Sequence, residues 1–260
     1  MKIFLISESF ISIRENNVKI ATVIDKANSF LKNLQKSIQK FDNFVFICND
    51  PVQFEQNDIS ADFIAKAFKA QLKEFKNVIV LDNRTRQDAK NILQNADFVY
   101  LQGGKIPVQN KFLKEINFEK NINSDATIVG KSAGAMNLCE QVYNYPEEDN
   151  EVGGQKWYDG IGLCKYIIIP HFNLQNGNEF CFGNFNLLKD YYLPQSMSKK
   201  LYALTNGAYI LIEDNAIVYG ESYVIQNGKI EKICENNQFK ILNWWRSRQE
   251  SNPNQWFRRN

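Results

Sequence analysis

Histidine is almost absent from the sequence: His171 is the only one among its 260 residues. The five cysteines are dispersed, and no two of them form a Cys-x-x-Cys pair. These scarcities exclude the clustered ligands of a structural zinc site, so we expect no metal. An odd, scattered set of thiols is typical of reduced cysteines in a cytosolic protein, and we therefore expect a cytoplasmic location.

The sequence also lacks a charge bias and a long apolar run. Lys and Arg number 31 against 29 Asp and Glu, a net charge of +2, which argues against a surface dedicated to nucleic acid. No apolar run approaches the ~20 residues of a membrane span. The apolar start of the chain ends at Ser7, too early for the core of a signal peptide. We expect no membrane association.

Short β-rich runs alternate with longer amphipathic stretches. Most of the runs are continuous in Val, Ile, Phe and Tyr, as in parallel strands that are covered on both faces. The alternation predicts a doubly wound fold, a three-layer α/β/α arrangement with a central, mostly parallel sheet. The expected strands are Lys2–Ile6, Phe44–Cys48, Val78–Leu81, Asp97–Leu101, Ala126–Val129 and Tyr166–Ile169. The expected helices are Ala21–Lys40, Ala61–Phe75, Arg86–Asn95 and Ala133–Val142.

The pattern changes after the segment Asn178–Tyr192. Closely spaced strands follow, and the pair Asn227-Gly228 is a strong hairpin signal, so we expect an antiparallel extension at one edge of the sheet. These strands are Leu201–Thr205, Tyr209–Ile212, Ala216–Tyr219, Tyr223–Gln226 and Ile230–Ile233. No Pro-, Gly- or Ser-rich linker interrupts the chain, which indicates one domain, residues 1–240.

Residues 241–260 differ in character from the rest, being basic and aromatic without clear periodicity. Aromatic residues among arginines can bind nucleic acid. An appended tail explains the same composition, and we favour this second interpretation.

A Gly-x-Ser-x-Gly motif provides the first candidate for chemistry. Gly130, Ser132 and Gly134 lie between an expected strand and an expected helix, the setting of a nucleophile elbow. The serine must sit in a tight, strained turn, so bulky residues cannot flank it at the two glycine positions. The alternative is an ordinary glycine-bearing turn in which Ser132 caps the helix.

Two further signals follow other expected strands. The pair Gly103-Gly104 permits close backbone approach, and the Gly104 amide, together with that of Ala133, could form an oxyanion hole. The pair lacks the spacing of a phosphate-binding loop. His171 directly follows the strand Tyr166–Ile169, at the sheet edge where an open α/β fold places its ligands. Considered alone, Gly103-Gly104 would be interpreted as an ordinary turn, and His171 as a histidine with a structural role.

At this point the sequence resembles a known family. Segments 128–137, 100–104 and 170–172 resemble the nucleophile, oxyanion-glycine and histidine segments of the S51 serine peptidases, the peptidase E and cyanophycinase family. The stretch 202–221 follows the same family's pattern, so the resemblance covers roughly residues 1–235. It implies a class I glutamine-amidotransferase-like α/β fold.

One position departs from the family. The resemblance implies an acid, Asp or Glu, where this chain has Asn206. That acid orients the histidine and stabilises its imidazolium form, so an amide should weaken general-base catalysis, although an Asn can still hold an imidazole. The loop that contains Glu147 and Glu148 offers substitutes, because an acid in this region has also been considered catalytic in the family. We favour a solvated acidic turn for this loop.

These observations predict a serine hydrolase that acts on a small peptide or peptide-like amide without a cofactor. Ser132 would be the nucleophile and His171 the base, oriented by Asn206 or, second, by Glu148, and the chain would be a dipeptidase or isopeptidase-like enzyme. Glutamine amidotransfer is disfavoured because those enzymes use a cysteine in place of Ser132. The alternative is a catalytically impaired binding or regulatory protein, which Asn206 motivates. A homodimer is compatible with the sequence.

Overall fold

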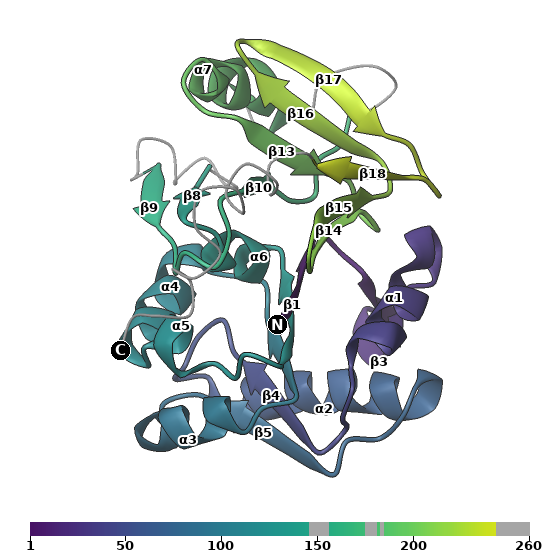
Figure 1. Ribbon diagram of the computed structural model, residues 1–260, viewed down its shortest axis with the longest axis vertical. Coiled ribbons are helices and arrows are strands. Elements are labelled where there is room, and N and C mark those ends of the chain that lie inside the picture. Colours follow the sequence, from purple (N-terminus) through teal and green to yellow (C-terminus); the bar gives the residue numbers. More distant parts are fainter. Residues whose placement is uncertain (146–155, 175–180, 183–184, 243–260) are drawn as a thin grey trace.

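The computed structural model describes residues 1–145, 156–174, 181–182 and 185–242 (Figure 1). An eight-stranded central sheet has the order β18-β15-β14-β1-β7-β6-β4-β5. The strands β1, β7, β6, β4 and β5 run parallel, and β14, β15 and β18 continue the sheet antiparallel beyond β1. Their bounds are β1 Lys2–Ile6, β4 Asn43–Ile47, β5 Asn77–Leu81, β6 Phe98–Leu101, β7 Thr127–Lys131, β14 Tyr209–Ile212, β15 Ala216–Tyr219 and β18 Phe239–Leu242.

Helices cover both faces of this sheet, because successive side chains of a strand point to opposite sides. On β4, Val45 and Ile47 face a core rich in Ile, Leu and Val beneath α3, α4, α5 and α6, whereas Phe44 and Phe46 face a largely aromatic core beneath α1 and α2 (Figure 1). The helices are α1 Phe30–Ser37, α2 Phe54–Gln71, α3 Ala89–Gln94, α4 Ile106–Glu115, α5 Phe118–Asn121 and α6 Ala133–Leu138. This arrangement confirms the predicted three-layer α/β/α class.

A second sheet of four strands, in the order β10-β13-β16-β17, lies beside α7 at one end of the molecule (Figure 1). The bounds are β10 Ile167–Ile169, β13 Leu201–Leu204, β16 Ser222–Gln226, β17 Lys229–Cys234 and α7 Leu193–Ser196. The expected strand Tyr166–Ile169 is therefore wrongly placed in the central sheet, since β10 pairs in parallel with β13. The antiparallel strands are divided between the two sheets, because the chain crosses from β13 to β14 and back from β15 to β16.

The expected helix Ala21–Lys40 is wrong over its first part. Its first four residues are the end of β3 (Val18–Ile24), which forms a hairpin with β2 (Phe10–Glu15), and a short 3-10 turn (Ala27–Ser29) and α1 follow. The turn residues Asn16 and Asn17 have φ of 47° and 64°, the left-handed region that asparagine tolerates in tight hairpin turns. The β-branched residues of β3 pair across to β2, and this long-range pairing overrides the local helical spacing.

Other boundaries also differ. Helix α2 begins seven positions before the expected Ala61, and α6 stops at Leu138, after which β8 (Gln141–Tyr143) pairs with β9 (Trp157–Asp159). Helix α4 was not expected from the sequence. The remaining elements are a 3-10 turn Arg86–Asp88, β11 Cys181–Phe182, β12 Phe185–Asn186 and a π-helix Leu187–Tyr192.

Within the described ranges, no helix has both the length and the apolar character needed to cross a membrane. Residues 243–260, which form most of the predicted basic tail, lie outside the described residues. The division into a domain of residues 1–240 and a tail of residues 241–260 stays a prediction.

Candidate active site

Ser132 lies in a strained turn between β7 and α6. Its φ of 49° and ψ of −115° are rarely adopted by a residue with a side chain, and the side chain makes no helix-capping hydrogen bond. A Cβ added at Gly134 would lie 2.5 Å from the carbonyl oxygen of Leu101, and one at Gly130 would lie 2.8 Å from the amide nitrogen of Ala135. The two glycines of the motif are thus required by close backbone approach. A strained backbone of this kind is what a nucleophile elbow requires, and the missing capping hydrogen bond disfavours the capping alternative.

His171 lies beside this turn. Its Nε2 is 3.0 Å from Ser132 Oγ, within hydrogen-bond reach of a nucleophile and its base. We expected the two residues to follow adjacent strands of one sheet, and this is wrong. His171 follows β10 of the smaller sheet, and the carboxyl ends of β7 and β10 converge from different sheets. The backbone of His171 has φ of 55°, and the residue is exposed to solvent.

Asn206 completes a chain of three side chains. Its Oδ1 lies 2.8 Å from His171 Nδ1. Asn206 sits in the turn between β13 and β14, where the next residue, Gly207, has φ of 85° and donates its amide N–H to the carbonyl of Glu8 at 2.8 Å. The buried Asn28 side chain donates to the Gly207 carbonyl at 2.9 Å. The turn that carries Asn206 is therefore anchored on both sides. The other candidates for orienting His171, Glu147 and Glu148, lie outside the described residues.

The predicted oxyanion loop packs against the nucleophile. A Cβ added at Gly103 would lie 3.1 Å from Ser132 Cβ, and one at Gly104, whose φ is 141°, would lie 2.1 Å from Asn49 Nδ2. Ser132 donates its own amide N–H to the carbonyl of Ile6 at 2.9 Å. Over the described part of the chain, the amides of Gly104 and Ala133 donate no hydrogen bond. Both are therefore free to donate to an oxyanion that develops beside Ser132.

A buried amide network, which the sequence analysis missed, ties this loop to α6. Gln109 Nε2 donates to the carbonyl of Gln102 at 2.7 Å, just before the glycine pair. Asn137 of α6 donates to Gln109 Oε1 at 3.1 Å and to the carbonyl of Ile106 at 3.2 Å, and accepts from Asn110 at 3.1 Å. The signal in the sequence was an Asn five positions after Ser132 on an otherwise apolar helix face.

The end of β1 contributes polar groups that the sequence analysis also missed. Glu8 and Lys131 form an ion pair of 2.6 Å, with about a quarter of each side chain exposed (27% and 23%). Burial, and then the charge of Lys131, lower the pKa of Lys19 on the neighbouring hairpin. Ser7, fully buried, accepts the amide N–H of His171 at 2.7 Å. The carboxyl end of β1 thus supports the site between β7 and β14.

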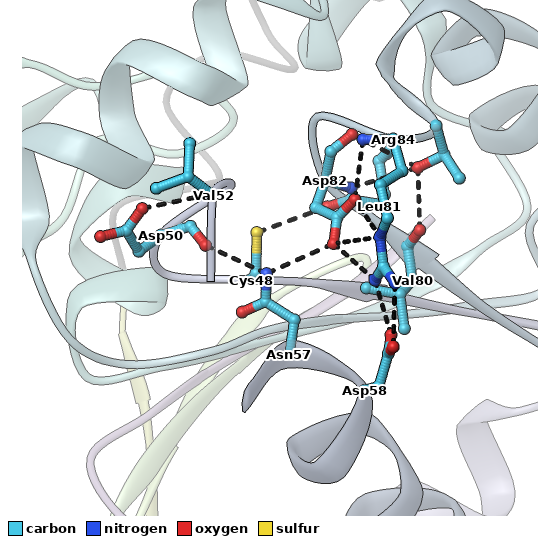
Figure 2. Close-up of polar contacts among 10 residues, drawn as sticks. Cys48, Asp50, Val52, Asn57, Asp58, Val80, Leu81, Asp82 and Arg84 are labelled. Carbon is cyan, nitrogen blue, oxygen red and sulfur yellow. Dashed lines mark hydrogen bonds and ion pairs between the residues drawn. The ribbon is translucent and has the colours of Figure 1, made fainter. Parts of the chain in front are cut away.

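A second polar cluster lies at the carboxyl ends of β4 and β5 (Figure 2). The buried Asp82 accepts from Arg84 Nη2 at 2.7 Å and from Asn57 at 3.3 Å, and Arg84 also pairs with Asp58 at 2.6 Å. Nearby, burial raises the pKa of the Cys48 thiol to about 12, so the thiol stays protonated and unreactive. The carboxylate of Asp82 is paired and hydrogen-bonded, as a buried charge in a structural role requires. Gln109 of the amide network donates to the carbonyl of Cys48 at 3.1 Å, which connects this cluster to the Ser132 site.

Across the residues that the structure describes, no three His, Cys, Asp or Glu side chains gather in a way that could hold a metal ion. The groups brought together at the site are a hydroxyl, an imidazole, an amide and two backbone N–H groups. This set is suited to acyl transfer through a serine nucleophile.

Comparisons with known proteins bear on the fold and on the family of the chain. No curated protein matches the chain. A crystal structure of a protein named provisionally as a peptidase E, from Listeria monocytogenes EGD-e, is similar in fold, with a TM-score of 0.50 and 16% sequence identity. The match covers 89% of this chain and 98% of that one. The model of peptidase family S51 matches residues 3–219, which include Ser132, His171, Asn206 and the oxyanion loop, and the chain therefore belongs to this family of serine peptidases.

Proposed function

We propose that this protein is a serine hydrolase that cleaves a small peptide or peptide-like amide, as a dipeptidase or isopeptidase-like enzyme. The observation that carries the proposal is the 3.0 Å approach of His171 Nε2 to the Oγ of Ser132, a serine held in a strained turn. Membership in family S51 supports a peptide as the substrate. The acidic loop is not needed for this role, because Asn206 already reaches His171.

In the first half of the reaction Ser132 Oγ attacks the scissile carbonyl while its proton passes to His171 Nε2. The N–H groups of Gly104 and Ala133 stabilise the oxyanion of the tetrahedral intermediate. The C–N bond then breaks, and His171 gives its proton to the leaving amine, which leaves an ester on Ser132. In the second half His171 takes a proton from water and the hydroxide attacks the ester carbon. The bond between Ser132 Oγ and that carbon then breaks, the proton passes from His171 to Oγ, and the carboxylic acid product leaves.

Hydrolysis of a panel of dipeptides and isopeptides by the purified chain tests the proposal. We expect turnover that Ser132→Ala and His171→Gln abolish and that Ser12→Ala, a change on the exposed hairpin, leaves intact. Turnover that survives Ser132→Ala would overturn it. No turnover from any protein, with circular dichroism showing intact folding, would favour the alternative of a binding protein that keeps the site without its chemistry.

A further inference from the structure

Ser7 lies where the three functional side chains meet the central sheet. It directly follows β1, and its side chain is fully buried. The preceding residue, Ile6, accepts the amide N–H of Ser132 at 2.9 Å, and Ser7 donates its own amide N–H to the carbonyl of Ala208 at 3.2 Å, two residues beyond Asn206. This single strand end therefore touches the segments that carry the nucleophile and the orienting amide.

The Ser7 hydroxyl makes two hydrogen bonds whose directions can be assigned. A backbone N–H can only donate, so the 2.7 Å contact from His171 N uses Ser7 Oγ as an acceptor. The proton of the hydroxyl needs another partner. Of the residues that the structure describes, Asn206 alone supplies an acceptor, its Oδ1 at 3.3 Å. The oxygen of the Asn206 amide therefore points toward Ser7.

This orientation decides which ring nitrogen of His171 carries the proton. The same Oδ1 lies 2.8 Å from Nδ1, so it accepts from an Nδ1–H group, and the lone pair of Nε2 is then left facing Ser132 Oγ at 3.0 Å. If the amide rotated by half a turn, its NH₂ group would face both partners. The buried Ser7 hydroxyl would then lose the acceptor for its proton, which costs free energy. The ring proton of His171 would move to Nε2, and a protonated Nε2 cannot accept a hydrogen bond from Ser132.

We propose that Ser7 is a positioning residue that fixes the amide orientation of Asn206 and, through it, the base-competent tautomer of His171. The inference rests on the proposed function for its consequence in catalysis, but the tautomer itself can be measured without turnover. A carboxylate has two equivalent acceptor oxygens and no NH₂ group, so an acid at this position would need no neighbour to fix its orientation. The requirement for Ser7 follows from having an amide at position 206.

His171 is the only histidine of the chain, so its ring nitrogens give unambiguous ¹⁵N signals. In histidine-labelled protein, at a pH where the ring is neutral, we expect the proton on Nδ1. Ser7→Ala should shift the tautomer population toward Nε2–H by roughly tenfold, and Ser7→Thr, which keeps the hydroxyl, should restore it. Ser9→Ala is the matched control, because Ser9 is equally buried and its hydroxyl has no hydrogen-bond partner in the described structure.

A proton on Nε2 in the wild-type chain, or an unchanged tautomer in Ser7→Ala, would overturn the inference. Should Ser7→Ala fail to fold, Ser7→Cys carries the same test, since a thiol is a weak donor. In turnover, Ser7→Ala should lower kcat at least ~10-fold, within the ~10⁴ that a wrong tautomer costs a serine protease. In the Asn206→Asp background, Ser7→Ala should change kcat by less than about threefold. Equal losses of kcat in the wild-type and Asn206→Asp backgrounds would contradict the inference. A chain without turnover contradicts the proposed function and leaves the tautomer measurement decisive.

Discussion

Nδ1 of His171 and Oδ1 of Asn206 lie 2.8 Å apart, so the side chain that contacts this nitrogen in the described structure is a neutral amide. An acid at this position would do two things: it would hold the imidazole and stabilise the imidazolium that forms when Ser132 loses its proton. The amide can do only the first. The site therefore has the arrangement of a Ser-His-acid triad without its negative charge, and this determines what substitution at Asn206 should do.

We expect Asn206→Asp to raise turnover. The carboxylate would take the place of the amide against His171 and stabilise the imidazolium electrostatically. The reverse change in a serine protease costs ~10⁴ in turnover, which is the upper limit for the gain, since part of that loss comes from the wrong tautomer. Single-turnover hydrolysis of a dipeptide or an activated ester measures the effect.

The variant Glu148→Gln separates this account from its alternative. If Asn206 orients His171, Glu148→Gln should leave the single-turnover rate unchanged. A rate that collapses in Glu148→Gln and does not respond to Asn206→Asp would assign the orienting role to the acidic loop.

The buried network around Asn137 should matter for both stability and rate. Asn137→Leu removes donors to Gln109 and to the Ile106 carbonyl, and unsatisfied buried groups cost about 1–3 kcal/mol. We also expect kcat to fall by roughly tenfold at a nearly constant KM, because misplacing a catalytic group by 1 Å can cost ~10² in rate. Urea unfolding and steady-state kinetics measure the two effects.

Asn123→Leu is the control for this prediction. Asn123 donates to the carbonyl of Ala96 at 2.9 Å, just before the amino ends of β6 and β7, whereas the site lies at the carboxyl ends of the strands. Loss of this bond should lower stability and leave kcat unchanged. Equal effects of the two variants on kcat would show that the network does not position the oxyanion loop.

The cluster in Figure 2 predicts that an ion pair with one buried partner contributes more to stability than a fully exposed pair. Arg84→Met leaves the fully buried carboxylate of Asp82 without its cation, and breaking a buried pair typically costs ~3–5 kcal/mol. We expect a loss at or below the lower end, because the Arg84 side chain is 38% exposed and Asn57 still donates to Asp82. Lys66→Met, which removes an exposed pair with Asp62, should change the unfolding free energy by less than about 1 kcal/mol. Similar losses in the two variants would contradict a structural role for the cluster.

Alkaline pH should destabilise the fold. Burial raises the pKa of the Cys48 thiol from an ordinary value of 9.0 to about 12, so between these values the unfolded chain releases a proton that the folded chain keeps. The stabilising contribution is complete below pH 9 and is lost as pH rises toward 12, at about 1.4 kcal/mol per pH unit for each such group. Burial also raises the pKa of Tyr100. Urea unfolding at several pH values measures the slope, which Cys48→Ala should reduce; an unchanged slope would contradict the assignment.

The sequence predicted the α/β class because most of the parallel strands are buried on both faces and read as continuous apolar runs. It failed where pairing partners are distant in the chain. The strand before His171 could equally have joined either sheet, and only its pairing with β13 decides. The expected helix Ala21–Lys40 wrongly includes the end of the hairpin strand β3, because the local spacing of the apolar residues from Ala21 onward also suits a helix.

Within the site, the motif residues were recognisable because each follows a strand and has a geometric requirement, such as small size at Gly130 and Gly134. Ser7 and Gln109 were not, because a buried serine or glutamine has no sequence signature until its partners are known. Their roles come from contacts across large separations: Ser7 meets His171 164 positions away, and Gln109 meets Cys48 61 positions away.

The most direct test of the central claim is labelling of the chain with a serine-directed phosphonate, followed by peptide mapping. If Ser132 is the nucleophile and His171 its base, the label should appear on Ser132 alone, disappear in Ser132→Ala and form much more slowly in His171→Gln. Ser12→Ala should be labelled at the wild-type rate. A folded chain that takes no label, or one labelled elsewhere as readily when Ser132 is replaced, would contradict the account.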